Sequence, residues 1–203
     1  MNPLPAPAAT PMAGPAPTGG AGHLSILGMP GSGKTTLGQA LAAHFGLPFL
    51  DLDAAVVARA GQDIPAIFQQ HGEAHFRQLE AEVLRDVLAR PEALVLATGG
   101  GTPCFHHNLA ELRACSFTLW LDVSVPVLAA RLAAAAETAS RPLLATAGPP
   151  ETWLRETLAA RNQFYAQARL RCPDAAAPVA GLAARLVAAG FAPPQAIKSL
   201  PGT

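Results

Sequence analysis

The 203-residue chain lacks an excess of charge of either sign. It carries 14 Lys and Arg residues against 14 Asp and Glu residues, so its formal net charge is zero with neutral histidines. Proteins that bind nucleic acids by neutralising phosphates, or anionic membranes through polybasic segments, need a basic excess. The composition therefore disfavours both classes of protein, and it still allows a small local cluster of basic residues.

Lysine is nearly absent. Lys34 and Lys198 are the only two lysines against twelve arginines, and Lys34 is the first charged residue of the chain. Lysine carries a compact point charge, whereas arginine carries a planar fork of donors. A chain that otherwise uses arginine but has lysine at position 34 indicates a specific need for such a point charge.

Cysteine is scarce, and long apolar runs are missing. The three widely spaced cysteines Cys104, Cys115 and Cys172 indicate neither a disulfide framework nor a zinc site, which favours a reducing compartment. Residues 1–33 contain no Lys or Arg, which disfavours a secretory leader or an Arg-rich transit peptide. No apolar run approaches the length of a membrane span. We expect a soluble cytoplasmic protein.

The two ends differ in composition from the body of the chain. Residues 1–22 are mostly Pro, Ala and Gly, and residues 192–203 are similar. Such segments bury too little apolar surface to offset their ordering entropy, so we expect a disordered arm and a flexible tail. The alternative is that the arm docks to a partner. The domain itself is expected at 23–191.

Strand-like and helix-like patterns alternate through this domain. That alternation predicts an α/β fold, with a parallel sheet covered by helices on both faces and ligands at the carboxyl ends of the strands. The expected strands are 23–27, 48–51, 94–97, 117–121 and, at an edge, 169–172. The expected helices are 34–45, 53–60, 64–70, 73–90, 127–136, 151–167 and 179–189.

A phosphate-binding motif follows the first expected strand. Residues 28–35 read Gly-Met-Pro-Gly-Ser-Gly-Lys-Thr, which matches G-x-x-x-x-G-K-[ST] between a strand and a helix. The glycines let backbone N–H groups surround phosphates at a helix N-terminus, Lys34 reaches the outer phosphates, and the Thr35 hydroxyl can ligate Mg²⁺. The alternative is a Gly-rich structural turn. The motif predicts binding of a nucleoside triphosphate with Mg²⁺.

The motif alone does not choose among kinases, GTPases, motors and nucleic-acid ATPases. The short body disfavours motors and helicases, and the guanine-specific N-K-x-D signature is missing because neither lysine lies in one.

Two carboxylates, Asp51 and Asp53, end the second expected strand. An acidic residue here can hold the water shell of Mg²⁺ or orient a substrate hydroxyl. Residues one apart on an extended chain point in different directions, so we expect two separate roles. The alternative for Asp53 is that it only caps the next helix.

A basic residue and three glycines come next. Arg77 lies in the first turns of a helix, where the helix dipole disfavours a cation, so it needs an anionic ligand or an ion pair with Glu80. Gly99, Gly100 and Gly101 follow the third strand. Three glycines cost conformational entropy and suit a backbone that must approach a ligand closely; a plain flexible turn is the alternative.

Two arginines follow near the end of the domain. Arg141 lies in an expected loop, 137–150, from which it can close over phosphates. Arg161 is four residues before Tyr165, and the alternative is that the two form a surface cation–π pair. Together these residues predict a small acceptor with a hydroxyl for Asp53 and a carboxylate for the planar forks of Arg77 and Arg161.

Taken together, these segments resemble the shikimate kinase family over about residues 24–190. The resemblance implies a P-loop fold like that of nucleoside-monophosphate kinases, with a five-stranded parallel sheet flanked by helices and a mobile lid at about 136–150. It also implies transfer of the γ-phosphoryl of ATP to the 3-hydroxyl of shikimate, in aromatic amino-acid synthesis. The segments that carry it are 28–36, 49–53, Gly72-Glu73, Phe76-Arg77, Glu80, 99–101, Arg141-Pro-Leu-Leu, Arg161 and Tyr165.

The resemblance assigns roles residue by residue. It implies catalytic roles for Lys34, Asp53 and Arg141, and a shikimate site formed by Asp53, Arg77, Gly100 and Arg161. It implies that Thr35, and Asp51 through water, bind Mg²⁺. The implied ATP-binding residues are Gly31, Ser32, Gly33, Lys34, Thr35, Thr36 and Arg141.

The chain departs from the family pattern in two places. Residues 102–107 read Thr-Pro-Cys-Phe-His-His where many members carry Ala-Val; we expect the two histidines at the surface, at a helix start, with a weak metal pair as the alternative. The lid segment contains one basic residue, so closure over ATP would rest on Arg141 and Arg131.

Two rival functions remain at this point. One is a kinase of another small hydroxy acid such as gluconate, and the other is a non-catalytic nucleotide-binding protein. We expect a monomer that binds neither nucleic acid nor membrane.

Overall fold

The computed structural model describes residues 22–138, 150–173 and 178–193. The expected arm, apart from Gly22, lies outside the described residues. The same holds for residues 194–203 of the tail and 139–149 of the lid, which include Arg141.

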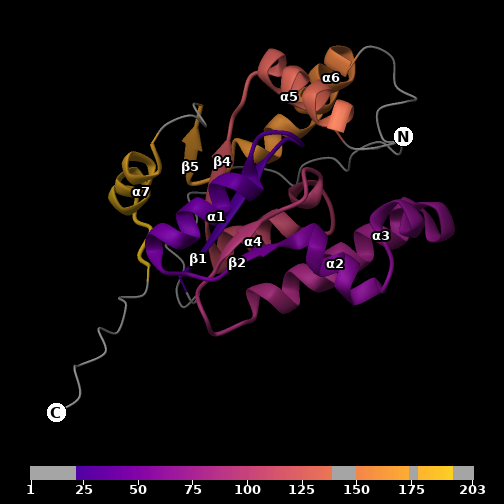
Figure 1. Ribbon diagram of the computed structural model, residues 1–203. Coiled ribbons are helices and arrows are strands. Elements are labelled where there is room, and N and C mark those ends of the chain that lie inside the picture. Colours follow the sequence, from indigo (N-terminus) through magenta and orange to yellow (C-terminus); the bar gives the residue numbers. More distant parts are fainter. Residues whose placement is uncertain (1–21, 139–149, 174–177, 194–203) are drawn as a thin grey trace.

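Five parallel strands form one sheet in the order β2-β3-β1-β4-β5 (Figure 1). β1 and β4 are buried along their whole length because each has neighbours on both sides and helices on both faces. β5 is an edge strand, as expected. The strands are β1 (His23–Gly28), β2 (Phe49–Asp51), β3 (Val95–Ala97), β4 (Ser116–Leu121) and β5 (Leu170–Cys172).

The helices connect these strands. Glycines in the left-handed region, Gly46 (φ 66°) and Gly61 (φ 67°), end the first two, at the bounds expected for helices 34–45 and 53–60. The helices are α1 (Lys34–Phe45), α2 (Leu52–Ala60), α3 (Ile64–Leu88), α4 (Asn108–Cys115), α5 (Val125–Thr138), α6 (Pro150–Tyr165) and α7 (Val179–Ala188), with a 3₁₀ turn, η1, at Thr102–Cys104.

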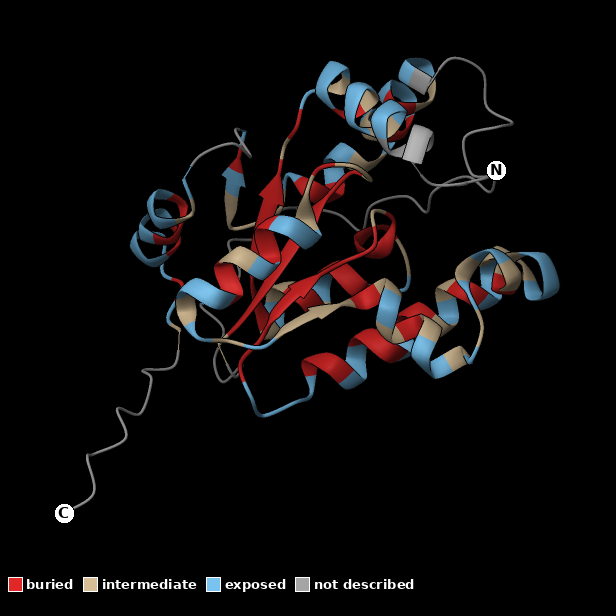
Figure 2. Ribbon diagram, in the orientation of Figure 1, coloured by how far each residue is buried: buried red, intermediate tan, exposed pale blue. Residues whose placement is uncertain are grey.

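Two apolar layers sandwich the sheet (Figure 2). Alternate residues of each strand point to opposite layers, so Ile26 of β1 belongs to one cluster and Leu27 to the other. α1 and α7 cover the first face through residues such as Leu41 and Leu186. Helices α2, α3, α4 and α6 cover the second face.

The structure differs from the sequence prediction in the helices. The two helices expected at 64–70 and 73–90 form one element, α3, which is kinked where Gly72 adopts φ 81°. The sequence predicts a helix start at His106 and His107 but no range for α4, because its eight residues are too few to show a clear apolar period. His106 and His107 are exposed immediately before α4, in the surface position expected for them.

None of the helices in the described part of the chain is long and apolar enough to cross a membrane.

One buried histidine makes stability depend on pH. His23 is 1% exposed, and its Nδ1 accepts a hydrogen bond from the Leu94 N–H at 3.3 Å. Burial lowers its pKa below the ordinary value of 6.5, because the apolar surroundings disfavour the imidazolium. The unfolded chain therefore binds this proton first as pH falls through about 6.5, so the free energy of unfolding decreases there.

We expect the melting temperature of the His23→Asn variant to fall less than that of the parent protein between pH 7.5 and 5.5. His44 is exposed, so His44→Asn is the control and is expected to follow the parent curve. Parallel curves for His23→Asn and the parent would contradict this assignment. The measurement is thermal denaturation followed by circular dichroism.

Candidate active site

The predicted site residues that the structure describes meet at the carboxyl edge of β1, β2 and β3. The loop 28–35 leaves β1, Asp51 ends β2, and Gly99–Gly101 follow β3. They border a cavity of about 870 Å³. Its lining includes Gly31, Ser32, Gly33, Lys34, Thr35, Thr36, Asp51, Asp53, Gly100 and Arg131.

The phosphate-binding loop, residues 28–35, is shaped by glycines. Gly31 (φ 77°) and Gly33 (φ 94°) adopt conformations that other residues avoid, which turns the chain around the Lys34 side chain. Lys34 Nζ donates to the carbonyls of Gly28 and Met29, each at 2.9 Å. Burial lowers the pKa of Lys34 to about 8, against the opposing effect of the nearby carboxylates Asp53 and Asp51.

Arg131 of α5 packs on the outside of this loop. Its Nη1 donates to the carbonyl of Ser32 at 3.1 Å and to that of Gly31 at 3.4 Å. The contact joins α5, the helix that leads into residues 139–149, to the phosphate-binding loop.

Asp51 uses its two oxygens for two tasks. Oδ2 accepts a hydrogen bond from Thr35 Oγ1 at 2.9 Å, and Oδ1 accepts the N–H of Asp53 at 3.0 Å and that of Ala54 at 3.5 Å. Asp51 is therefore the cap of α2. The alternative that Asp53 only caps this helix is wrong, because Asp51 is the cap, and the two carboxylates make different contacts.

Asp53 points instead towards the glycines after β3. A Cβ added to Gly99 would lie 2.9 Å from Asp53 Oδ1. The pKa of Asp53 is raised to about 6, chiefly by burial and then by the charges of Asp51 and Glu80. Lys34 and Arg77 oppose this rise. Asp53 thus provides a carboxylate that can exchange a proton near neutral pH.

Each of the three glycines makes room for a different group. Added Cβ atoms would lie 2.8 Å from Glu80 Oε1 at Gly99, 3.0 Å from Arg161 Nη1 at Gly100, and 2.7 Å from Arg77 Nη2 at Gly101. Real Cβ contacts are longer than this, so side chains here would displace the site residues. Charged side chains of the protein itself occupy the space beside these glycines, whereas the predicted close approach to a ligand stays a prediction. A plain flexible turn does not account for this crowding.

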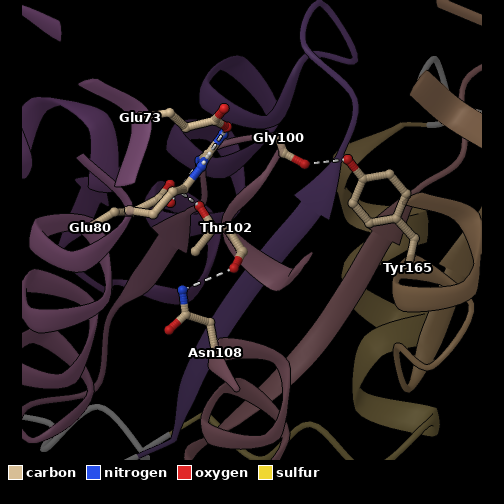
Figure 3. Close-up of polar contacts among 7 residues, drawn as sticks. Glu73, Glu80, Gly100, Thr102, Asn108 and Tyr165 are labelled. Carbon is tan, nitrogen blue, oxygen red and sulfur yellow. Dashed lines mark hydrogen bonds and ion pairs between the residues drawn. The ribbon is translucent and has the colours of Figure 1, made fainter. Parts of the chain in front are cut away.

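Arg77 is held by two carboxylates, Glu73 and Glu80 (Figure 3), and by two aromatic rings. Its Nη1 donates to Glu80 Oε2 at 2.8 Å, and its Nε and Nη2 donate to Glu73 Oε1 at 3.4 Å. The Phe76 and Phe105 ring centres lie 5.0 Å and 4.4 Å from its Cζ. The ion pair with Glu80 is the one considered from the sequence. Among the described contacts, three of the five guanidinium N–H groups are used, which leaves two for a ligand.

Tyr165 connects α6 to the glycines. Its hydroxyl donates to the carbonyl of Gly100, and its side chain is completely buried (Figure 3). Burial raises the pKa of this phenol, and the charge of Arg161 opposes the rise. A surface cation–π pair between Arg161 and Tyr165 is therefore wrong. Arg161 instead lies beside Gly100.

Two of the residues that build this site were not given a site role from the sequence. Glu80 appeared only as a partner of Arg77, yet it is buried and also accepts the Thr102 hydroxyl at 2.6 Å. The sequence signal that could have pointed to Thr102 was the Thr-Pro-Cys segment after the glycines, where the chain departs from the family pattern. Arg141 lies outside the described residues.

The fold and the site define a class of protein. The strand order, the loop after β1, the acidic pair after β2 and the convergent arginines are those of a P-loop kinase that acts on small molecules. The chain belongs to the shikimate kinase family, because the model of that family, "Shikimate kinase", matches residues 30–189.

Two curated relatives have high similarity. The shikimate kinase of Phocaeicola vulgatus is 40% identical over 149 residues, which cover 72% of this chain and 83% of that protein. The shikimate kinase of Xanthomonas campestris pv. campestris is 47% identical over 122 residues, 60% of this chain and 66% of that protein. The chain thus spans slightly less than two thirds of the Xanthomonas relative.

Solved structures agree with this membership. The Acinetobacter baumannii shikimate kinase in complex with shikimate has a TM-score of 0.72 and 32% identity, covering 81% of this chain and 90% of that one. A gluconokinase of Sinorhizobium meliloti has a TM-score of 0.51 at 19% identity, covering 83% and 91%. The second likeness shows a shared fold alone, so the comparisons favour shikimate kinase over gluconate kinase.

The crowding at the glycines makes a stability prediction. Gly101 has an ordinary φ of −93°, so only space requires glycine there. In Gly101→Ala the methyl group meets Arg77, which Glu80 and Phe105 hold in place. Such overpacking costs about 1–3 kcal/mol. Each kcal/mol corresponds to about 2–4 °C of melting temperature in a domain of this size.

Gly181→Ala is the matched control. A Cβ at Gly181 of α7 would meet nothing within 4 Å, and alanine favours a helix over glycine by about 0.5–1 kcal/mol. We expect thermal denaturation to show opposite shifts, a lower melting temperature for Gly101→Ala and a higher one for Gly181→Ala. Equal melting temperatures for Gly101→Ala and the parent would show that the site accommodates the methyl group.

Proposed function

We propose that this protein is a shikimate kinase, which transfers the γ-phosphoryl of ATP to the 3-hydroxyl of shikimate and yields shikimate 3-phosphate and ADP. The observation that carries the proposal is the placement of Arg77, Arg161 and Asp53 around the same three glycines. The two guanidinium groups suit a carboxylate, and Asp53 suits a hydroxyl of the same small molecule. The similar kinase from Acinetobacter baumannii was solved with shikimate bound, which supports the same choice of acceptor.

The nucleotide side of the proposal rests on the phosphate-binding loop. Backbone N–H groups from Gly31 to Thr36 would surround the phosphates of ATP, and Lys34 would neutralise their outer oxygens. Lys34 already lies across the loop, held by two carbonyls that phosphate oxygens can replace as its partners. Arg141 would close over the phosphates from the lid segment.

The donor set after β1 and β2 suits Mg²⁺. Thr35 and Asp51 offer a hydroxyl and a carboxylate 2.9 Å apart, and Mg²⁺ prefers hard oxygen ligands and retains several waters. Thr35 would bind the ion directly and Asp51 through water. When bound, Mg²⁺ would neutralise charge on the transferred phosphoryl group.

Asp53 would orient the acceptor hydroxyl and accept its proton late in the transfer. Phosphoryl transfer depends mainly on positioning and charge stabilisation, so a weak base is sufficient. The raised pKa of Asp53, about 6, suits a group that takes up a proton and releases it again.

We further propose that the enzyme works in the cytoplasm as a monomer and binds neither nucleic acid nor membrane. The zero net charge, and the presence of Cys104, Cys115 and Cys172 as thiols, support these proposals.

A coupled assay that detects ADP, with shikimate and gluconate as parallel acceptors, tests the proposed function. We expect turnover with shikimate alone. Turnover with gluconate alone would identify a kinase of another hydroxy acid. ATP binding without turnover on either acid would revive the non-catalytic alternative.

Asp53→Asn separates catalysis from stability. We expect kcat to fall by about 100-fold or more, because a positioned base contributes about 10²–10⁴-fold. The Kd for ATP is expected to stay nearly unchanged, because the loop residues that would bind ATP are intact. The melting temperature is expected to rise, because a raised pKa means that the folded site disfavours the charge of Asp53.

Asp63→Asn is the control for this experiment. Asp63 caps α3 through Ala66 N–H at 2.8 Å, and asparagine caps helices equally well. Neither its kcat nor its melting temperature is expected to change. Normal turnover in Asp53→Asn would remove Asp53 from the mechanism.

The two shifted pKa values predict a pH profile. We expect kcat/KM for shikimate to fall about tenfold per pH unit below about 6, where Asp53 takes up a proton. We expect kcat/KM for ATP to fall above about 8, where Lys34 loses its charge. kcat itself should hold further into the alkaline range, because bound phosphates stabilise the ammonium form. If kcat/KM for shikimate still falls below about pH 6 in Asp53→Asn, another group is responsible for that fall.

A further inference from the structure

A chain of buried polar contacts runs behind Arg77 (Figure 3). Arg77 donates to Glu80 Oε2, Thr102 Oγ1 donates to Glu80 Oε1 at 2.6 Å, and Asn108 Nδ2 donates to the Thr102 carbonyl at 3.0 Å. Glu80, Thr102 and Asn108 are each at most 1% exposed. Buried carboxylates need such partners, because an unpaired charge in the core is costly.

The two oxygens of Glu80 are divided between Thr102 and Arg77. A carboxylate can rotate about its last bond with little cost, since that torsion is broad. The Thr102 hydroxyl removes this freedom by binding Oε1, so Oε2 alone faces Arg77. Glu80 therefore uses only one N–H group of Arg77, on Nη1. The other N–H groups of the guanidinium do not bind Glu80.

Thr102 is itself anchored on both sides. Its N–H donates to the Gly99 carbonyl at 3.2 Å, which closes the turn over the glycines, and Asn108 of α4 holds its carbonyl. The hydroxyl that orients Glu80 is therefore fixed relative to the loop that borders Asp53 and Arg161.

The orientation of Arg77 depends on this carboxylate. Arg77 Cζ lies over the rings of Phe76 and Phe105, which restrain the position of the guanidinium but offer no hydrogen-bond acceptor that would fix the direction of its N–H groups. Glu73 contacts it only at 3.4 Å and is partly exposed, whereas Glu80 contacts it at 2.8 Å and is buried. Glu80 therefore sets the direction of the unused N–H groups.

We propose that Thr102 is a positioning residue for the substrate carboxylate: it holds Glu80 so that two N–H groups of Arg77 remain directed at the ligand. The inference rests on the proposed function, because it concerns how the same acid is bound. Thr102 acts through Glu80 and does not itself contact the reacting atoms.

Thr102→Val removes the hydroxyl and keeps the side-chain volume. Glu80 then turns both oxygens towards Arg77 and occupies N–H groups that the ligand needs. We expect KM for shikimate to rise about tenfold, a difference that corresponds to about 1.4 kcal/mol of binding. kcat and KM for ATP are expected to change less than about twofold, because uniform loss of acid binding leaves the transfer step intact.

Thr102→Ser is the rescue variant and is expected to restore KM, because serine keeps the hydroxyl. Thr118→Val is the control for loss of a buried hydroxyl. Thr118 lies inside β4 and accepts the Arg169 N–H at 3.0 Å. We expect Thr118→Val to lower the melting temperature without changing KM for shikimate. If Thr102→Val does not fold, Thr102→Ala replaces it in the same comparison.

A double-mutant cycle tests the route of the effect. If Thr102 acts through Glu80, then Thr102→Val adds little to KM in a Glu80→Gln background, since the changes share one pathway. Additive effects of the two substitutions would overturn the proposed route. An unchanged KM in Thr102→Val, or no rescue by Thr102→Ser, would overturn the positioning role itself.

An NMR measurement keeps this inference separate from the proposed function. In ¹⁵N-arginine-labelled protein, the Arg77 Nε–H signal, assigned through Arg77→Lys, reports the orientation of the guanidinium without turnover. We expect this signal to shift in Thr102→Val and to return in Thr102→Ser. A parent protein that does not phosphorylate shikimate would end the proposed function, whereas an unmoved Arg77 signal would end the inference about Thr102.

Discussion

The site depends on three consecutive residues that have no side chains. Gly99, Gly100 and Gly101 follow β3 at the centre of the carboxyl edge, and the space that their Cβ atoms would occupy is filled by groups from three directions. Glu80 and Arg77 approach from α3, Asp53 from α2, and Arg161 from α6. Elements far apart in sequence can therefore place charged groups against one short backbone segment. The packing of α2, α3 and α6, the buried Tyr165 and the 3₁₀ turn η1 all leave room for these side chains to approach the three glycines.

Charge in the site is balanced within the described part of the chain. The described site contains four cations, Lys34, Arg77, Arg131 and Arg161, and four carboxylates, Asp51, Asp53, Glu73 and Glu80. The zero net charge of the sequence is thus repeated on a local scale. Such a site attracts a polyanionic nucleotide only weakly by itself, because its carboxylates offset its cations. This balance supports the proposed Mg²⁺ beside Thr35 and Asp51.

Much of the fold could be predicted from the sequence, because strong local signals mark it. Left-handed glycines end α1 and α2, and the buried strands β1 and β4 are rich in apolar residues. The kink at Gly72 and the short helix α4 were harder to predict, since tertiary packing decides both. In the site, residue types and their order indicated Asp53 and Arg77. Which aspartate caps α2, and what Thr102 binds, depend on side-chain directions that only the folded chain determines.

Asp51 joins two parts of the molecule that would bind different ligands. One oxygen contacts Thr35 at the start of α1, and the other fixes the first turn of α2, which carries Asp53. A ligand that moves the Asp51 carboxylate away from Thr35 would therefore also change the cap of α2. Thermodynamic linkage makes such coupling reciprocal, so the acid would change the affinity for the nucleotide by the same factor as the nucleotide changes that for the acid. A single carboxylate can thus make the binding of two substrates cooperative within one protein chain.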